Sequence, residues 1–119
     1  MTICLLGSVA EAQARRGKLV HMVSFKFKSS ATRDQIQAVE QAFRGLKKKI
    51  RVIRSFEWGT NVSPEGFDKG FTHGFILTFD SVKDRDAYLV HPDHAAFGKL
   101  VGPLLDDGGV FVVDFFAQN

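Results

Sequence analysis

The hydrophobic pattern of this chain changes its period several times, and the order of the changes limits the folds open to it. Apolar residues at spacings of three and four indicate one amphipathic helix, from about Thr32 to Lys49. Alternation typical of strands is found in three segments, and a fourth is apolar on both sides. The four predicted strands are Leu19 to Lys28, Val52 to Asn61, Thr72 to Asp80 and Gly109 to Ala117.

Helix boundaries carry recognisable capping residues. Thr32 followed by Gln35 predicts a capping box at the start of the long helix. Ser81 can cap a short helix that extends to Val90, where His91-Pro92 interrupts it. Proline suits the first position of a new helix, so His91 is its predicted cap residue. One stripe of this second helix carries His94, Phe97, Val101 and Leu104, and we expect it to end before Gly108 and Gly109.

The resulting order, β-α-β-β-α-β, predicts an α+β, ferredoxin-like fold with an antiparallel four-stranded sheet and both helices on one face. The other face would then be exposed, although it carries Val20, Met22 and Ile76. The last strand adds either its Val110, Val112, Phe116 row or its Phe111, Val113, Phe115 row. An exposed apolar sheet face favours a partner. We therefore predict a homodimer that packs through the sheet face with two-fold symmetry.

Length and composition exclude several classes of protein. A chain of 119 residues fits one domain, and Cys4, the only cysteine, excludes an intrachain disulfide, a zinc knuckle and a CxxC motif. The formal net charge is only +3. The one dense basic run lies around Lys47 to Arg54 and lacks interleaved aromatic residues, so it is interpreted as a solvated helix end, and no nucleic-acid partner is expected.

The domain is expected to occupy residues 18–119, after an N-terminal extension of residues 1–17. Thr2 to Ala10 is apolar, and Ala12-Gln13-Ala14 is similar to a signal-peptide cleavage site. The run is too short to span a bilayer, so no membrane insertion is expected. Two interpretations stay open: the tail of a signal peptide, with an exported or periplasmic protein, or an ordinary extension of a cytoplasmic one.

Three histidines and the single tyrosine are the candidate functional residues. His21 and His73 each start the more apolar face of a strand, and His94 lies on the apolar stripe of its helix. If those faces meet, the three imidazoles and Tyr88 converge, and an imidazole beside a phenol can act as an acid–base pair. The alternative is that these are core histidines with satisfied hydrogen bonds.

Other chemistries find less support. A metal site would need His91 and His94 with His21 or His73, but no carboxylate completes the set, so neither a metal nor a cofactor is predicted. Asp114 is a carboxylate inside an apolar strand, and it is expected at the dimer interface or the sheet edge.

Four segments of the chain are distinctive: HMVSFKFK, Phe56-Glu57-Trp58-Gly59, Thr72-His73 and above all Ala87 to His94 with Phe97-Gly98. Together they resemble a known family, the stress-responsive dimeric α/β-barrel (Dabb) domain. The resemblance covers about Lys18 to Phe116 and implies a ferredoxin-like unit whose sheets pair into a barrel across a dimer.

The resemblance also implies roles for individual residues, through a plant polyketide cyclase of the family that works by aldol condensation. It implies that His94 is the general base, Tyr88 its hydrogen-bonded partner and His21 a residue that holds the substrate. His73 matches a histidine near the pocket, which Phe25, Phe43 and Phe97 would line. Phe43 departs from the cyclase, which has a tyrosine there.

Two functions are therefore expected. The first is a homodimeric stress-response protein that binds a small hydrophobic molecule between sheet and helices. The alternative is a cofactor-independent cyclase or lyase that uses His94 and Tyr88 as acid and base.

Overall fold

The computed structural model describes residues 17–118, so the predictions for the N-terminal extension lie outside the described residues. Within them, no helix is both long enough and apolar enough to cross a bilayer. The elements follow the predicted order. They are β1 (Leu19–Phe27), α2 (Arg33–Lys49), β2 (Ser55–Thr60), β3 (His73–Phe79), α3 (Val82–Leu89), α4 (Pro92–Val101), the 3-10 turn η1 (Gly102–Leu104) and β4 (Leu105–Phe116).

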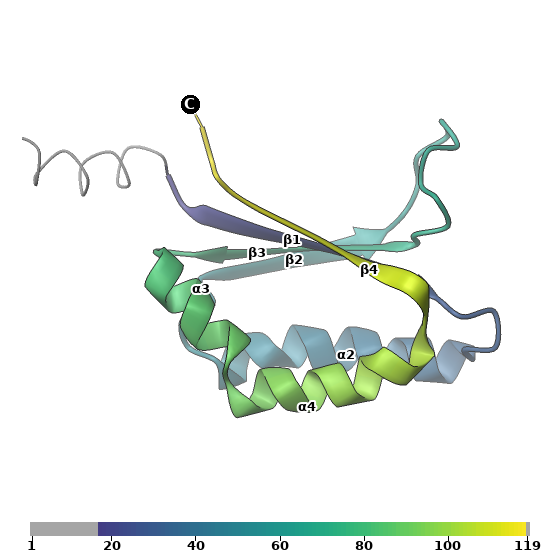
Figure 1. The fold of residues 1–119 in the computed structure, drawn as a ribbon, viewed down its shortest axis with the longest axis horizontal. Coiled ribbons are helices and arrows are strands. Elements are labelled where there is room, and N and C mark those ends of the chain that lie inside the picture. The colour runs from purple at the N-terminus through teal and green to yellow at the C-terminus, as the bar shows by residue number, and fades with distance from the viewer. Residues whose placement is uncertain (1–16, 119) are drawn as a thin grey trace, which may run out of the picture.

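The four strands form one sheet in the order β2-β3-β1-β4, and every neighbouring pair is antiparallel. Figure 1 shows that α2, α3 and α4 all lie on the same side of this sheet. The predicted α+β, ferredoxin-like fold is therefore confirmed, with β2 and β4 as the two edge strands.

The predicted helix caps are present. Thr32 Oγ1 accepts a hydrogen bond from the Gln35 N–H at 3.1 Å, and Gln35 Oε1 accepts one from the Thr32 N–H at 2.9 Å. Ser81 caps α3, and His91 caps α4 with Pro92 in its first turn. Because α4 starts at this cap, the cap fixes which residues of the helix face the sheet.

Two predicted strand boundaries are wrong. The second strand starts at Ser55 instead of Val52, because the chain first turns, with the Ile53 N–H bonded to the Ile50 carbonyl at 3.2 Å. The last strand starts at Leu105 instead of Gly109. Its two glycines lie within the strand because β4 is bulged there: Gly108 has φ = 65°, and a Cβ on Gly109 would collide with the Lys26 carbonyl oxygen.

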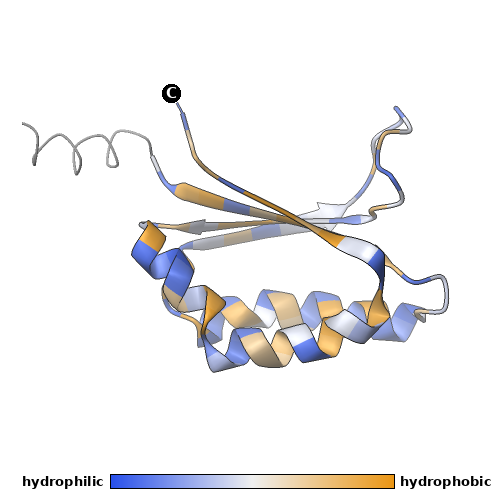
Figure 2. Cartoon of the chain, viewed as in Figure 1, coloured by the Kyte–Doolittle hydropathy of each residue, from blue (hydrophilic) through white to orange (hydrophobic). Residues whose placement is uncertain are grey.

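Between the sheet and the helices, phenylalanine rings fill the core. Phe43 of α2 lies 4.4 Å from Phe75 of β3 and 4.5 Å from Phe97 of α4, centroid to centroid, and Phe25 of β1 contacts all three. Figure 2 shows long hydrophobic stretches on the strands and a largely hydrophilic α3. Several phenylalanines of the chain thus pack together in this layer between the sheet and the helices.

The two faces of β4 differ in what they meet. Register pairs Phe111, Val113 and Phe115 with residues of β1 on the outer sheet face, which no described helix covers. Val110 and Val112 point to the helix side, yet 52% and 49% of their surface stays exposed. Among the described elements, β4 packs extensively only against β1. The helices therefore leave the inner face of the edge strand uncovered.

Candidate functional site

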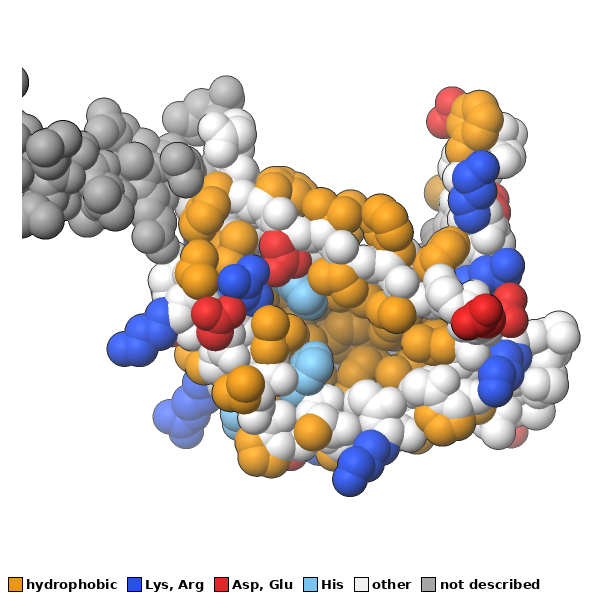
Figure 3. Space-filling view, in the orientation of Figure 1, with side chains coloured by type: hydrophobic (Ala, Val, Ile, Leu, Met, Phe, Trp, Pro, Cys, Tyr) orange, Lys and Arg blue, Asp and Glu red, His pale blue; other side chains and the backbone are white. Residues whose placement is uncertain are grey.

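Three of the four predicted site residues meet beside the uncovered strand. The Tyr88 ring of α3 lies 4.6 Å from His94 of α4 and 5.6 Å from His21 of β1, centroid to centroid, each edge to face. Figure 3 shows the surface hollowed between the sheet edge and the helices, with histidine side chains at its wall and hydrophobic atoms at its floor. The predicted convergence of His21, Tyr88 and His94 is confirmed.

His73 does not join this group. It pairs in register with Phe25, four residues along β1 from His21, which corresponds to about 13 Å along the strand. Its ring packs edge to face with Phe27, and its Nε2 lies 2.6 Å from Glu40 Oε2 of α2. The prediction that all three histidines share one volume is therefore wrong. His21 and His73 both lie near the start of their strands, and the antiparallel pairing of β1 and β3 places them at opposite ends of the sheet.

Asp114 has a partner that the sequence pattern did not identify. The residue lies on the edge strand, as one of the two predicted alternatives stated, but its side chain points toward the helices. Its Oδ1 lies 2.7 Å from His21 Nδ1, and its Oδ2 accepts a hydrogen bond of 2.7 Å from Nη1 of Arg85 in α3. The predicted place at the sheet edge is thus confirmed, and a place at a dimer interface stays a prediction.

Arg85 is the residue that sequence analysis missed. It lies three positions before Tyr88 on α3, so both side chains reach the same side of the helix. Arg85 could have been predicted from that spacing together with the unexplained carboxylate in an apolar strand. The hydrogen bonds to Asp114, and then to Asp86, raise the pKa of Arg85.

Two polar atoms of the site have no hydrogen-bond partner within residues 17–118. The described residues make no hydrogen bond to the Tyr88 hydroxyl or to Nε2 of His21. Every fully buried side-chain polar atom in the described part of the chain does have a hydrogen-bond partner. Both atoms therefore have access to solvent, although Tyr88 is only 1% exposed. Such atoms can bind a polar group of a ligand.

The protonation states of Tyr88 and His94 differ from those of free side chains. Burial raises the pKa of Tyr88, and the nearby charge of Asp114 raises it further, so the hydroxyl keeps its proton. Burial lowers the pKa of His94, and the proximity of His21 adds to this, while a hydrogen bond to the Leu89 backbone acts in the opposite direction. At neutral pH the site thus offers a hydroxyl donor beside an uncharged imidazole.

Phe25, Phe43 and Phe97, predicted to line a ligand pocket, are buried in the core and in contact with one another. Contact of these rings with a ligand stays a prediction. His91 is engaged as a helix cap, since its Nδ1 accepts from the Asp93 N–H at 3.0 Å. Within residues 17–118, no group of three or more His, Cys, Asp or Glu side chains is arranged to hold a metal ion.

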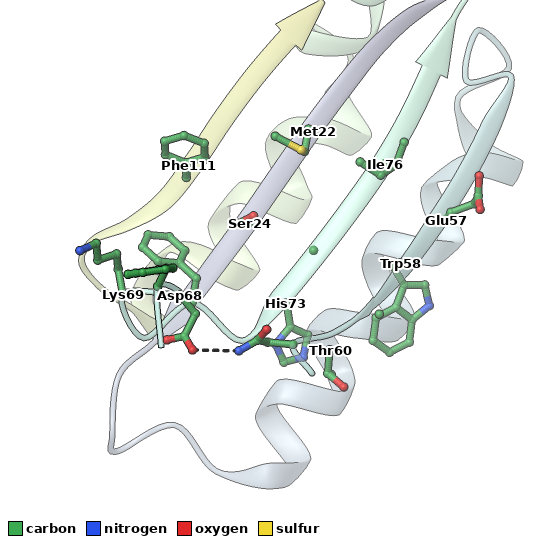
Figure 4. A pocket seen from close by; sticks show the side chains of 15 residues that line it. Met22, Ser24, Glu57, Trp58, Thr60, Asp68, Lys69, His73, Ile76 and Phe111 are labelled. Carbon is green, nitrogen blue, oxygen red and sulfur yellow. Dashed lines mark hydrogen bonds between the residues drawn. The ribbon is translucent and has the colours of Figure 1, made fainter. Parts of the chain in front are cut away.

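A second hollow, of about 650 Å³, lies on the outer face of the sheet. Figure 4 shows Met22, Ile76 and Phe111 on its floor, with Asp68 and Lys69 of the β2–β3 loop at its rim. His21, Tyr88 and His94 do not line it. The outer face is therefore both apolar and concave, and it is separated from the histidine site by the sheet.

Fold and site together define a class: a single ferredoxin-like unit with a histidine–tyrosine cluster under an uncovered edge strand. The chain belongs to the stress-responsive A/B barrel domain family, whose model matches residues 19–117.

Two relatives with assigned names are similar over most of the chain. A stress-response A/B barrel domain-containing protein, HS1 of Arabidopsis thaliana, is 30% identical over 84% of this chain and 90% of its own length. Olivetolic acid cyclase of Cannabis sativa is 31% identical over 66% of this chain and 77% of its own length.

Solved structures agree with this placement. The crystal structure of At3g17210 from Arabidopsis thaliana has a TM-score of 0.79 and 29% identity, and the match covers 85% of this chain and 96% of the other. A dimeric ferredoxin-like protein of unknown function from Jannaschia sp. CCS1 has a TM-score of 0.73 and 28% identity, over 83% and 98% of the two chains. Structural neighbours of this chain are thus described as dimers.

The lowered pKa of His94 can be measured directly by NMR titration of its ring. We expect a midpoint below the ordinary value of about 6.5. Because the unfolded chain binds this proton more readily, His94 should reduce the stability of the fold as pH falls through that range. In His21→Gln the midpoint should rise yet stay below the ordinary value, since burial is the larger cause.

His91→Ser is the matched control, because serine also caps helices and the substitution leaves the surroundings of His94 in place. It should not move the midpoint. A wild-type midpoint at or above about 6.5 would contradict the description of the site.

Proposed function

We propose that the protein binds a small, largely hydrophobic molecule in the hollow between β4 and α4, with the polar end of the ligand at Tyr88 and His94. The observation that carries the proposal is the half-exposed state of Val110 and Val112, two apolar residues on the helix side of the sheet. Apolar walls with a few convergent polar groups are typical of ligand sites. The unpartnered Tyr88 hydroxyl and His21 Nε2 supply such groups.

We also propose that the protein is a homodimer that packs through its outer sheet face. The Phe111, Val113 and Phe115 row is 38% to 52% exposed and continuous with Met22 and Ile76. Water contact with so much apolar surface is unfavourable, and a two-fold axis lets the same row cover itself. The dimeric neighbours of similar fold support dimerisation.

Sedimentation tests the dimer. The wild-type chain should have twice the monomer mass of 13.2 kDa at micromolar concentration. Val113→Glu places a charge in the proposed interface and should give monomers, whereas Val90→Glu, on the exposed end of α3, should leave the dimer unchanged. A wild-type monomer would show that the outer face does not form the interface.

A second candidate function is catalysis, a cofactor-independent aldol-type condensation of a poly-β-keto substrate. Two observations favour it: an uncharged His94 beside a protonated Tyr88, and the similarity to a cyclase. The imidazole of His94 would take the proton of the carbon between two carbonyls, and that carbon would attack a third carbonyl. Tyr88 would donate a hydrogen bond to the resulting oxyanion, which then receives the proton from His94.

Turnover of tetraketide thioesters tests the catalytic proposal. His94→Ala and Tyr88→Phe should each lower kcat by about a hundredfold or more while the dimer persists. His91→Ser is the control for loss of a neighbouring imidazole and should keep full activity. If the wild-type protein shows no turnover but binds hydrophobic ligands, catalysis is excluded for these substrates and the binding function stands.

A further inference from the structure

The ion pair between Arg85 and Asp114 affects which ligands the hollow between β4 and α4 can bind. Both carboxylate oxygens of Asp114 are engaged, one with His21 and one with Arg85, each at 2.7 Å. The Asp114 side chain is only 20% exposed, so its charge needs these partners. Arg85 donates to one carboxylate oxygen, and an ionised carboxylate can only accept hydrogen bonds.

His21 must therefore donate from Nδ1. In a neutral imidazole, a proton on one ring nitrogen leaves the other as an acceptor. That other atom, Nε2, is the one without a protein partner in the hollow.

Neither Arg85 nor His94 offers the hollow an available cation. The Arg85 guanidinium is occupied by Asp114 and, at 2.9 Å, by Asp86. His94 is uncharged at neutral pH because burial lowers its pKa. A ligand carboxylate would thus meet an acceptor nitrogen and a nearby carboxylate, whereas a hydroxyl would find an acceptor for its proton.

We propose that Arg85 and Asp114 are positioning residues that hold His21 as a hydrogen-bond acceptor, and that the site thereby selects neutral ligands whose polar group donates a hydrogen bond: an alcohol, phenol or enol. The inference rests on the proposed binding function, since it concerns what that hollow prefers.

Three probes of nearly the same shape test this selection by calorimetry on the full chain at pH 8. They are 4-butylphenol, 4-butylanisole, which accepts but cannot donate, and the anion 4-butylbenzoate. We expect the phenol to bind about tenfold more tightly than the anisole, because the anisole leaves the His21 acceptor unsatisfied. The benzoate should bind more weakly than the anisole.

Variants identify the residues responsible. Asp114→Asn should reduce the phenol-to-anisole ratio to about three or less, because the asparagine amide can donate to Nδ1 and the tautomer of His21 is no longer fixed. Arg85→Gln should reduce the ratio to the same extent, because the carboxylate then pairs with a protonated His21, whose Nε2 donates instead of accepting. Arg54→Ala is the matched control. It removes another arginine–aspartate pair, with Asp80 at 3.5 Å, from the exposed surface, and it should keep the wild-type ratio.

A spectroscopic measurement on the wild-type protein makes the test independent of whether the variants fold. Nitrogen-15 NMR of the imidazole should show His21 protonated at Nδ1 and unprotonated at Nε2 at pH 8. The opposite tautomer, or equal affinities for phenol and anisole, would overturn the inference while leaving ligand binding intact. If none of the probes binds, the proposed function itself fails.

Discussion

The structure depends on incomplete packing of helices on the four-stranded sheet. The helices cover only one face of the sheet, and that face only in part. α2 and α4 pack on each other and over the central strands, while the edge strand β4 packs extensively only against β1 among the described elements. Apolar side chains on both sides of β4 are left in contact with water. The proposed ligand site and the proposed dimer interface are the two consequences, one on each side of the same strand.

Electrostatics at the inner side of β4 then determine what the site can do. Asp114 is held between His21 and Arg85, and it lies close enough to Tyr88 to help keep the phenol protonated. His94 is kept uncharged by burial. A donor hydroxyl and unprotonated nitrogens in an apolar hollow suit recognition of a neutral polar group, and the same set is suited to moving a proton.

Local patterns predicted most of the fold. The capping box at Thr32, the cap at His91 and the alternation in β1 and β3 act within a few residues, so their physics is visible in sequence. The start of β4 was mispredicted because Gly108 and Gly109, which usually end an element, here form a bulge against Lys26.

The site was predicted only in part, because its decisive contacts are distant in sequence. His21 and Asp114 are 93 residues apart, and their pairing depends on the register of two antiparallel strands. The same register separates His73 from His21, although both lie on one sheet face. Arg85 was not predicted as a site residue, because a single arginine on a short helix is common. Its role depends on the carboxylate opposite it, which only the structure shows.

A crystal structure of the protein with 4-butylphenol tests the proposed ligand site. We expect a bound ligand between β4 and α4, with its alkyl chain along Val110 and Val112 and its hydroxyl within hydrogen-bond distance of His21 Nε2, Tyr88 or His94. The outer sheet face should meanwhile be covered by a second copy of the chain. A ligand found instead against Met22 and Phe111, with the space beside His94 closed by side chains, would contradict it.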